Sequence, residues 1–325
     1  MKVILLDSQV ISGYDYSIEQ KIIEDAGFTF VKETCTNEDD VIARCSDADA
    51  ILNITIRMSE KSISQLKNCK VMVRYGIGYN EFDVDAATKM GIKICNVTTY
   101  CIPEVALHAT SLALALVRQL KHYDQCVANG VWNGNLGRKM RRPAGQTIGL
   151  CGFGNIAKAI AGNMQGIGYH VIAYDPYVTD RVFTEHNVKK VTLDELFAQA
   201  DIISLHLPET DETRGMINKD SIAKMKDGAI IINAARGPLV NEADLVDALK
   251  SGKVGGAGLD VLTEEPMKDK SNPLLAFENV ILTPHIAYNS VEANNELFQQ
   301  VAGTAVDILN GGNPPNIVNA KALNL

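Results

Sequence analysis

The chain has 325 residues, of which 46% are hydrophobic and 22% charged, and a formal net charge of −8 at pH 7. This length exceeds what one hydrophobic core usually serves, so we expect two domains. The acidic balance argues against nucleic acid or an anionic membrane as the main partner, because both need clustered Lys and Arg, whereas a single local Arg suffices for a small anionic substrate.

Short β-branched runs alternate with helical periodicity along most of the chain, which is typical of α/β units around parallel sheets. In the first hundred residues the pattern predicts strands at 2–6, 28–33, 50–54, 71–74 and 93–96. Helices are predicted between them at 18–26, 38–45, 59–66 and 84–90.

The segment 103–120 differs from these units. It opens with Pro103 and Glu104, which suit the first turn of a helix. It continues as VALHATSLALALVRQL, which is apolar on nearly every face. We therefore predict one long helix over 103–120 that is buried between domains or subunits.

A second α/β series begins at Gln146. Two such series, joined by the long apolar helix, predict an α/β protein of two doubly wound parallel-sheet domains with an intervening cleft. The pattern alone places the domain boundary near residue 145. The strands predicted in the second series are 147–150, 170–174, 202–205, 229–233, 256–260 and 280–283, and the closing helix is 291–309.

Cysteine usage and the N-terminal segment indicate the compartment. The seven cysteines are scattered, without the CxxC spacing or Cys/His cluster that holds zinc, so we expect reduced thiols and no metal. The first residues, MKVILLDSQV, lack the long apolar run of a signal peptide, and no segment approaches the roughly 18 apolar residues of a membrane span. The sequence therefore predicts a cytoplasmic protein without a membrane or nucleic-acid partner.

The motif GFGNIA at 152–157 follows the predicted strand TIGLC and opens a helical run. Gly152 permits a tight turn, Gly154 lets the backbone approach a pyrophosphate, and Ala157 lets the helix pack close to the sheet. The amides at the start of the helix would face the phosphates. A glycine turn of this kind is weak evidence by itself, but here it stands between a strand and a helix.

Asp175 ends the next predicted strand after this motif. A carboxylate at that place accepts hydrogen bonds from the adenosine ribose and repels a 2′-phosphate. Pro176 and Tyr177 follow, with no adjacent Arg to favour NADP. The sequence therefore predicts NAD as the cofactor.

Three candidate catalytic residues each follow a predicted buried strand of the second series. Arg236 lies in IIINAARGPLV, Glu265 in GLDVLTEEP and His285 in VILTPHIAYNS. The carboxyl ends of parallel strands share one edge of a sheet, so these side chains can converge. Each residue alone is more often a structural loop residue, and it is their joint occurrence downstream of a dinucleotide motif that favours a catalytic role.

This set suits the reduction of a 2-oxo acid. Arg holds a carboxylate and polarises a carbonyl group as a rigid fork. His can donate a proton to the carbonyl oxygen or, in the oxidative direction, accept one. A Glu against the other imidazole nitrogen fixes the tautomer.

Seven segments in order carry a resemblance to a known family. The sequence resembles the D-isomer-specific 2-hydroxyacid dehydrogenases over essentially its full length, and most of all the phosphoglycerate-dehydrogenase-like branch that includes the C-terminal-binding-protein subgroup. The resemblance implies a flavodoxin-like substrate domain of residues 1–98 and 291–325, and a Rossmann NAD domain of residues 99–290 through which the chain forms a homodimer. The segments are YGIGYNEFDVDAATKMGIKICNV, YCIPEVALHATSLALALVR, GLCGFGNIA, DIISLHLPETDET, NAARGPLVNEADL, GAGLDVLTEEP and ILTPHIAY.

The resemblance also implies roles for individual residues. His285 would be the acid/base, Glu265 its partner and Arg236 the cation that binds a small 2-oxo or 2-hydroxy acid. Ile54 stands where phosphoglycerate-type relatives tend to carry Arg, so a phosphorylated substrate is less expected. The implied cofactor-binding residues are Gly152, Gly154, Asn155, Ile156, Asp175, His206, Pro208, Thr213, Ala234 and Asp260. The implied substrate-binding residues are Tyr75, Gly76, Ile77, Gly78 and Tyr100, together with Arg236.

Two other functions are compatible with the same motifs. One is an NAD(H)-sensing interaction protein of the corepressor type with little turnover, and the intact trio Arg236, Glu265 and His285 argues against it. The other is an enzyme acting on formate or phosphite, which needs no proton delivered to a carbonyl oxygen. The Glu–His pair fits that chemistry less well.

Overall fold

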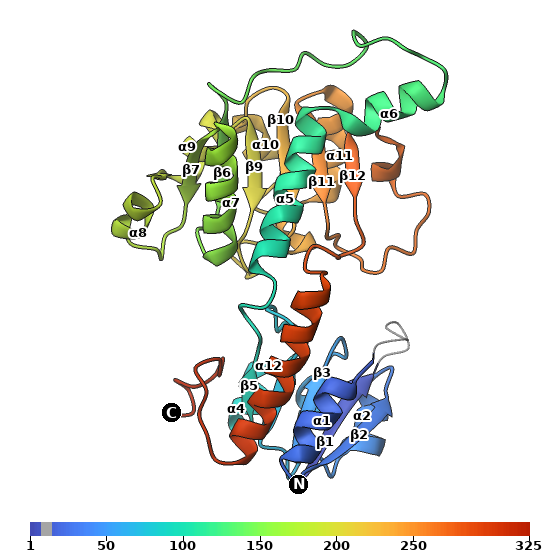
Figure 1. Ribbon diagram of the computed structural model, residues 1–325, viewed down its shortest axis with the longest axis vertical. Helices are drawn as coiled ribbons and strands as arrows, with labels where there is room; N and C mark the ends of the chain where they lie inside the picture. The colour runs from blue at the N-terminus through green and yellow to red at the C-terminus, as the bar shows by residue number, and fades with distance from the viewer. Residues whose placement is uncertain (8–14) are drawn as a thin grey trace. The chain divides into compact units, whose positions relative to one another are not determined.

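The computed structural model describes residues 1–7 and 15–325, which form two compact units. One unit combines Met1–Cys101 with Ser290–Leu325, and the other is Ile102–Asn289. Each unit contains one parallel sheet, so the predicted pair of doubly wound α/β domains is confirmed (Figure 1).

The first unit is built on a five-stranded sheet in the order β2-β1-β3-β4-β5. Helices α1 (Ser17–Asp25) and α12 (Val291–Leu309) pack against each other, and α12 covers β3 and β4. Helices α2 (Glu38–Cys45), α3 (Glu60–Ile63) and α4 (Val84–Lys89) form a second layer. The strands are β1 (Lys2–Asp7), β2 (Thr29–Thr34), β3 (Ala50–Asn53), β4 (Val71–Arg74) and β5 (Lys93–Cys95).

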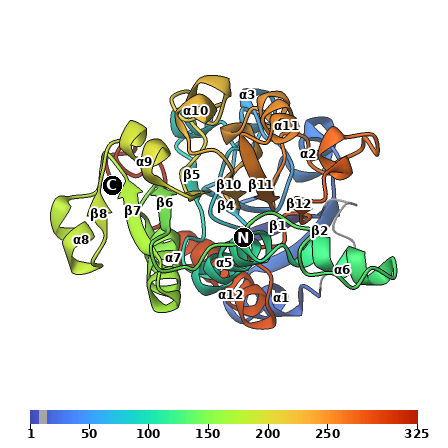
Figure 2. The same cartoon turned by 90° about the horizontal axis from the view of Figure 1, so that it is seen from above.

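The second unit is built on a seven-stranded sheet in the order β12-β11-β10-β9-β6-β7-β8. One face of the sheet is covered by α5 (Ile102–Val117) and α7 (Asn155–Ile167). The opposite face is covered by α9 (Leu193–Gln199), α10 (Lys219–Lys224) and α11 (Glu242–Ser251) (Figure 2). Two further helices, α6 (Leu120–Ala128) and α8 (Asp180–Glu185), lie outside these layers. The strands are β6 (Thr147–Cys151), β7 (His170–Tyr174), β8 (Lys189–Lys190), β9 (Ile202–Leu205), β10 (Ala229–Asn233), β11 (Val254–Leu259) and β12 (Val280–Leu282).

The domain boundary that the strand pattern places near residue 145 is wrong, because α5 belongs to the second unit. This helix packs against α7, β10 and β11, and its side chains Leu112 and Leu116 are part of the core on that face of the sheet. A helix that precedes the glycine motif by some forty residues therefore completes the nucleotide-type fold, which strand periodicity alone does not indicate.

The single helix predicted over 103–120 is also wrong. Helix α5 ends at Val117, Gln119 has a left-handed φ of +54°, and α6 begins at Leu120. The side chain of Gln119 accepts a hydrogen bond from the Arg138 amide and donates one to the Arg138 carbonyl, both at 2.7 Å. This long-range contact holds the break. Within the single chain, Leu107 on α5 is 63% exposed.

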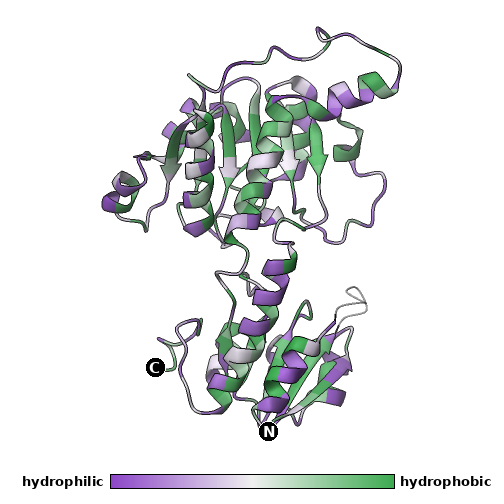
Figure 3. Ribbon diagram, viewed as in Figure 1, coloured by the Kyte–Doolittle hydropathy of each residue, from purple (hydrophilic) through white to green (hydrophobic). Residues whose placement is uncertain are grey.

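Hydropathy follows the layers in both units, with apolar strands and polar outer helix faces (Figure 3). In the second unit, one core cluster fills each side of the sheet, and a separate cluster packs between the five-stranded sheet and the layer of α2, α3 and α4. Strands buried on both faces read as continuous apolar runs, as in the strand AIIIN. The short strand β8 was not predicted, because its two residues are exposed lysines.

Candidate active site

The three candidate catalytic residues lie at one edge of the seven-stranded sheet. Strands β10, β11 and β12 are adjacent and parallel, so their carboxyl ends lie side by side. Arg236 follows β10, Glu265 follows β11 and His285 follows β12. The sheet topology therefore brings together residues that are up to 49 positions apart in the sequence.

His285 and Glu265 form a hydrogen-bonded pair, with 2.6 Å between imidazole Nδ1 and carboxylate Oε2. The second carboxylate oxygen accepts a hydrogen bond from the Leu262 amide at 2.9 Å. Burial alone would raise the pKa of Glu265, but the hydrogen bond and charge of His285, the Leu262 amide and the charge of Arg236 together lower it from its ordinary value of 4.5. Glu265 is therefore an anion at neutral pH.

The imidazole of His285 is available to a ligand. Its side chain is 47% exposed, and its Nε2 atom has no hydrogen-bond partner among the described residues. Because Nδ1 faces a carboxylate, it carries a proton, so Nε2 is the atom that gains or loses one. The pair can thus act as a general acid or a general base at Nε2.

The backbone at His285 has a left-handed φ of +54°, which is uncommon for a residue with a side chain. Asp260, which is 1% exposed, holds this turn. Its carbonyl oxygen accepts from the His285 amide at 2.8 Å, and its carboxylate accepts from the amides of Ile286 and Ala287 at 3.0 and 2.9 Å. Asp260 therefore fixes the direction in which the imidazole projects.

Arg236 lies in a loop that is held by hydrogen bonds to the fully buried side chain of Asn233. Asn233 donates from its side-chain amide to the Arg236 carbonyl at 2.8 Å and accepts from the Ala235 amide at 3.0 Å. The guanidinium donates one hydrogen bond, to the Ala235 carbonyl at 2.7 Å, and its other N–H groups have no acceptor among residues 1–7 and 15–325. A half-buried Arg with free donors suits a carboxylate ligand.

Gly237 joins the Arg236 loop to the Glu265 loop. A Cβ at this position would lie 2.0 Å from both the carbonyl carbon and oxygen of Leu262, and 2.5 Å from the amide nitrogen of Thr263. These are backbone atoms that no side-chain rotation can move away. The two loops therefore pack directly on each other at this glycine.

Gly237→Ala is expected to lower both stability and turnover. The added methyl would push away the Leu262 backbone, whose amide holds Glu265, so kcat should fall together with a loss of about 1–3 kcal/mol in the free energy of unfolding. Urea unfolding and steady-state kinetics would measure the two effects. Gly303→Ala is the matched control, since a Cβ there meets nothing within 4 Å. Unchanged kcat in Gly237→Ala would contradict this coupling.

The glycine motif fits a dinucleotide phosphate. Gly152 has a φ of +92°, and a Cβ there would lie 2.5 Å from the His206 carbonyl oxygen, so only glycine can occupy this turn. Gly154 is the N-cap of α7 and provides no side-chain cap, which leaves the first amides of the helix, including those of Asn155 and Ile156, for another acceptor. These features provide the donors that a pyrophosphate needs.

Residues expected around the adenosine also lie near this turn. The Asp175 carboxylate accepts from the amides of Phe153, at 2.9 Å, and of Tyr177, at 2.9 Å, so it is tied to the glycine turn. Burial lowers the pKa of His206 to about 3, and its Nε2 lies 2.7 Å from Ser204 Oγ. A neutral imidazole at this place offers no attraction to a 2′-phosphate.

The remaining expected cofactor residues occupy two loops at the same edge. Thr213 donates from its hydroxyl to the Pro208 carbonyl at 2.7 Å and so closes the loop after β9. Ala234 is half-buried in the loop after β10, two residues before Arg236. Their positions after β9 and β10 place them on the carboxyl edge, where ligands bind in doubly wound sheets.

The loop Tyr75–Gly78 belongs to the five-stranded unit and follows β4. The amides of Ile77 and Gly78 have no acceptor among the described residues, so two successive N–H groups are free. Gly76 has a φ of +129°, and a Cβ there would lie 3.6 Å from the hydroxyl of Tyr100. Free successive amides form a concavity suited to an anion.

Arg74 clamps this loop in place. Its Nε and Nη2 atoms pair with both carboxylate oxygens of Glu81 at 2.9 Å, and its Nη1 donates to the Tyr75 carbonyl. Sequence reasoning missed this clamp, as it missed Asn233, because nothing in the local pattern separates such residues from ordinary strand ends. Only the NAARG run, which places an Asn at the end of a buried strand, gives a hint.

Within residues 1–7 and 15–325, there is no group of three or more His, Cys, Asp or Glu side chains that could hold a metal ion. Across the same residues, no helix is both long and apolar enough to cross a membrane.

Comparison with known proteins identifies the family. Residues 110–287, more than half of the chain, match the model of the D-isomer specific 2-hydroxyacid dehydrogenase NAD binding domain. A hydroxypyruvate reductase from Blautia hydrogenotrophica is 37% identical over 98% of this chain and 100% of its own length. A D-3-phosphoglycerate dehydrogenase from Mycobacterium leprae is 38% identical over 86% of this chain, which spans only about half (52%) of that relative.

The solved structures agree. The D-lactate dehydrogenase from Aquifex aeolicus, complexed with NAD and lactic acid, superimposes with a TM-score of 0.86 at 27% identity, over 96% of each chain. The family that the motifs predicted is thereby confirmed, and with it the exchange of a hydride between NAD(H) and a 2-oxo or 2-hydroxy acid. The chain is therefore an NAD-dependent oxidoreductase that belongs to the D-isomer specific 2-hydroxyacid dehydrogenase family.

Proposed function

We propose that this protein reduces a small, unphosphorylated 2-oxo acid to the D-2-hydroxy acid, with His285 as the proton donor. The observation that supports this most directly is the His285–Glu265 pair at 2.6 Å, in which Nε2 of the imidazole has no partner among the described residues and the charge of Arg236 acts on the Glu265 carboxylate. A proton donor and a guanidinium group together are what the reduction of a carbonyl in an anionic substrate requires.

Each side chain has a defined task in this proposal. Arg236 binds the substrate and draws electron density towards the carbonyl oxygen through its free N–H groups. His285 delivers a proton from Nε2 to that oxygen as the alkoxide forms. Glu265 holds the ring by Nδ1 and, as an anion, stabilises the imidazolium before the transfer. In the oxidative direction, Nε2 accepts the proton of the hydroxyl group.

The cofactor would be held by the seven-stranded unit, which we propose as the NAD domain. Gly152 and Gly154, with the first amides of α7, would bind the pyrophosphate, and Asp175 would bind the adenosine ribose. His206, Pro208, Thr213, Ala234 and Asp260 would complete the contacts. When bound, NADH supplies the hydride that the carbonyl carbon receives.

The five-stranded unit is proposed as the substrate domain. The free amides of Ile77 and Gly78 would donate hydrogen bonds to the substrate carboxylate, with Tyr75, Gly76 and Tyr100 shaping the loop around it. This assignment is supported by the two unsatisfied N–H groups and by the Arg74–Glu81 clamp that keeps them in position.

The decisive experiment follows NADH absorbance with the purified protein and a panel of 2-oxo acids: glyoxylate, hydroxypyruvate, pyruvate, and branched and aromatic members. NADPH runs in parallel, and a second arm offers formate and phosphite with NAD⁺. We expect NADH-dependent reduction of at least one 2-oxo acid and a D-configured product. Turnover confined to formate or phosphite would reject the proposal, because that chemistry delivers no proton to a carbonyl oxygen.

The alternative is an NAD(H)-sensing interaction protein. It would bind NADH in a titration yet reduce no member of the panel at a rate above that of Arg236→Gln. The free Nε2 of His285 favours the enzyme, since a chain that only senses the cofactor needs no proton donor poised for a ligand. NADH binding without reduction of any panel member would redirect the search towards protein partners.

We also propose that the chain forms a homodimer through the NAD domain. Large apolar side chains are exposed along α6 and the segment that follows it, and Trp132 is 89% exposed. Exposure of such a patch is typical of an interface. The segment is anchored, since Tyr123 donates to the Gly134 carbonyl at 2.9 Å. The exposed set is Leu120, Val127, Val131, Trp132, Leu136 and Met140.

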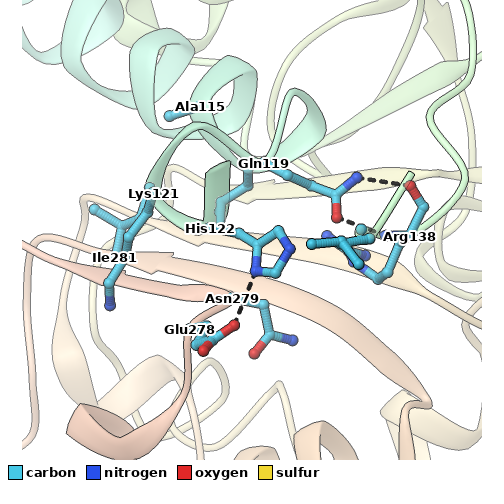
Figure 4. A pocket seen from close by; sticks show the side chains of 11 residues that line it. Ala115, Gln119, Lys121, His122, Arg138, Glu278, Asn279 and Ile281 are labelled. Carbon is cyan, nitrogen blue, oxygen red and sulfur yellow. Dashed lines mark hydrogen bonds and ion pairs between the residues drawn. The ribbon is translucent and has the colours of Figure 1, made fainter. Parts of the chain in front are cut away.

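A cavity of about 260 Å³ lies beside this segment (Figure 4). His122 and Glu278 line it and are hydrogen-bonded to each other, with 2.9 Å between Nδ1 and Oε2. Gln119, which also lines the cavity, is hydrogen-bonded to the Arg138 backbone. The cavity borders Asn279, which precedes β12, so it lies at the amino edge of the sheet and away from the catalytic residues. It offers a recess for a side chain of a second copy.

Trp132→Glu is expected to dissociate the dimer. A carboxylate in an apolar interface loses its hydration without gaining a partner, which is unfavourable by several kcal/mol. Light scattering after size exclusion would report the mass. Tyr177→Glu is the matched control, because Tyr177 is a similarly exposed aromatic (85%) on another element. A monomeric unmodified chain would contradict the proposal.

Finally, we propose a cytoplasmic location. It is supported by the seven free thiols, six of which are buried, since reduced cysteines persist in a reducing compartment.

A further inference from the structure

A histidine outside the catalytic trio is connected to the His285 turn. His108 lies on α5, and its side chain is 22% exposed. Its Nε2 atom is 2.9 Å from Thr283 Oγ1 and 3.5 Å from Asp260 Oδ1. Both contacts lie within the seven-stranded unit, so they join a helix on one face of the sheet to the loop at its carboxyl edge.

The direction of each hydrogen bond follows from the chemistry of the groups. The Thr283 hydroxyl donates to Asp260 Oδ1 at 2.5 Å, because the Asp260 carboxylate can only accept. The hydroxyl proton is thus used, and a lone pair of Thr283 Oγ1 must accept from His108. His108 therefore carries a proton on Nε2.

The chain of hydrogen bonds ends at the backbone on both sides of His285. The Asp260 carboxylate, which accepts a hydrogen bond from the Thr283 hydroxyl, also accepts hydrogen bonds from the amides of Ile286 and Ala287. The Asp260 carbonyl oxygen accepts one from the amide of His285. A left-handed φ at a non-glycine residue persists only where the surroundings hold it. Asp260 and its partners supply that restraint.

Asp260 is an almost fully buried carboxylate, and burial of an unpaired charge is strongly unfavourable. Among the described residues, His108 is the one basic side chain within 4.0 Å of this carboxylate. Removing it would leave the Thr283 oxygen without its donor and the carboxylate without its nearest potential cation. Thr283 would then be held less firmly against the carboxylate, and the turn would be less restrained.

We propose that His108 is a positioning residue for catalysis: through Thr283 and Asp260 it holds the turn that aims the imidazole of His285. The inference rests on the proposed role of His285 as the acid/base. His108 touches no reacting atom in this scheme and acts only by keeping Nε2 of His285 in place. Misplacement of a catalytic group by about 1 Å can lower a rate by up to about a hundredfold.

The test compares His108→Leu, which removes the donor, with His108→Gln, whose side-chain amide can still donate. We expect His108→Leu to lower kcat about tenfold with smaller changes in both KM values, and His108→Gln to restore kcat to within about threefold. His170→Leu is the control, since His170 is exposed and its side chain makes no hydrogen bond or ion pair with the described residues. Thermal melts verify that each variant is folded.

A double-mutant cycle with Thr283→Val separates positioning from packing. If both residues act through one chain of hydrogen bonds, the double variant loses no more kcat than the worse single variant. The inference would be overturned if the kcat losses of the two single variants multiplied in the double variant. It would also be overturned if the kcat of His108→Leu stayed within about twofold of the unmodified protein. Equal kcat losses in His108→Leu and His108→Gln, with a lowered melting temperature, would overturn it as well. Retained turnover in His285→Ala would instead refute the proposed function itself.

Discussion

His285→Ala is expected to lower kcat by about a thousandfold for reduction of the 2-oxo acid that the panel identifies, because it removes the proton donor from the carbonyl oxygen. General acid catalysis by a positioned side chain contributes about 10²–10⁴-fold. The KM for NADH should change little, since the glycine turn and Asp175 lie on other loops. Steady-state kinetics with NADH absorbance would measure both quantities.

Glu265→Gln is the companion variant. The amide oxygen can still accept from Nδ1 of His285, but it carries no charge, so the loss of kcat should be smaller than in His285→Ala. Because the pKa of Glu265 is lowered from 4.5, the native pair persists at neutral pH and is lost only as the pH falls through that lowered pKa. A kcat of His285→Ala near that of the unmodified protein would refute the assigned acid/base.

Arg236→Gln is expected to lower kcat/KM by about 10²–10³-fold, because a neutral amide neither binds the substrate carboxylate as a fork nor stabilises charge on the carbonyl oxygen. Both kcat and the KM for the 2-oxo acid should be affected. Arg236→Lys should recover only part of the loss, since a single ammonium group replaces a planar array of donors.

Misfolding of the Arg236→Gln variant can be distinguished from the loss of substrate binding. Arg236 donates only to the Ala235 carbonyl within the described structure, so its replacement should leave the melting temperature within a few degrees of the native value. Binding of NADH, followed by fluorescence titration, should also persist. If Arg236→Gln retained full kcat/KM, the substrate carboxylate would have to be bound elsewhere, for example by the loop amides alone.

Much of this protein could be predicted from local patterns. Strand periodicity and the glycine motif are short-range properties, and they predicted a pair of doubly wound sheets and the cofactor correctly. The motif around Gly152 specifies its own conformation, because a positive φ and a close carbonyl oxygen admit no side chain. The order of motifs also identified the family, which the comparisons confirm.

Other features depended on contacts between distant segments. The break at Gln119 is held by Arg138, and the place of α5 in the second unit is decided by its packing on β10 and β11. Helical periodicity predicts neither the break nor the packing of α5, since it depends only on residues that are close along the chain. The pattern-based boundary near 145 and the unbroken helix over 103–120 therefore failed.

The sequence by itself determined which residue types could perform the chemistry, since Arg236, Glu265 and His285 each follow a buried strand. Only the tertiary structure decided that Glu265 meets Nδ1 of His285 and leaves Nε2 free. It alone revealed the contact of Gly237 with the Leu262 backbone and the chain of bonds from His108 to the His285 turn. Such contacts arise where strands remote in sequence become neighbours in a sheet, and hydrogen-bond geometry at that edge is set by packing rather than by local propensity.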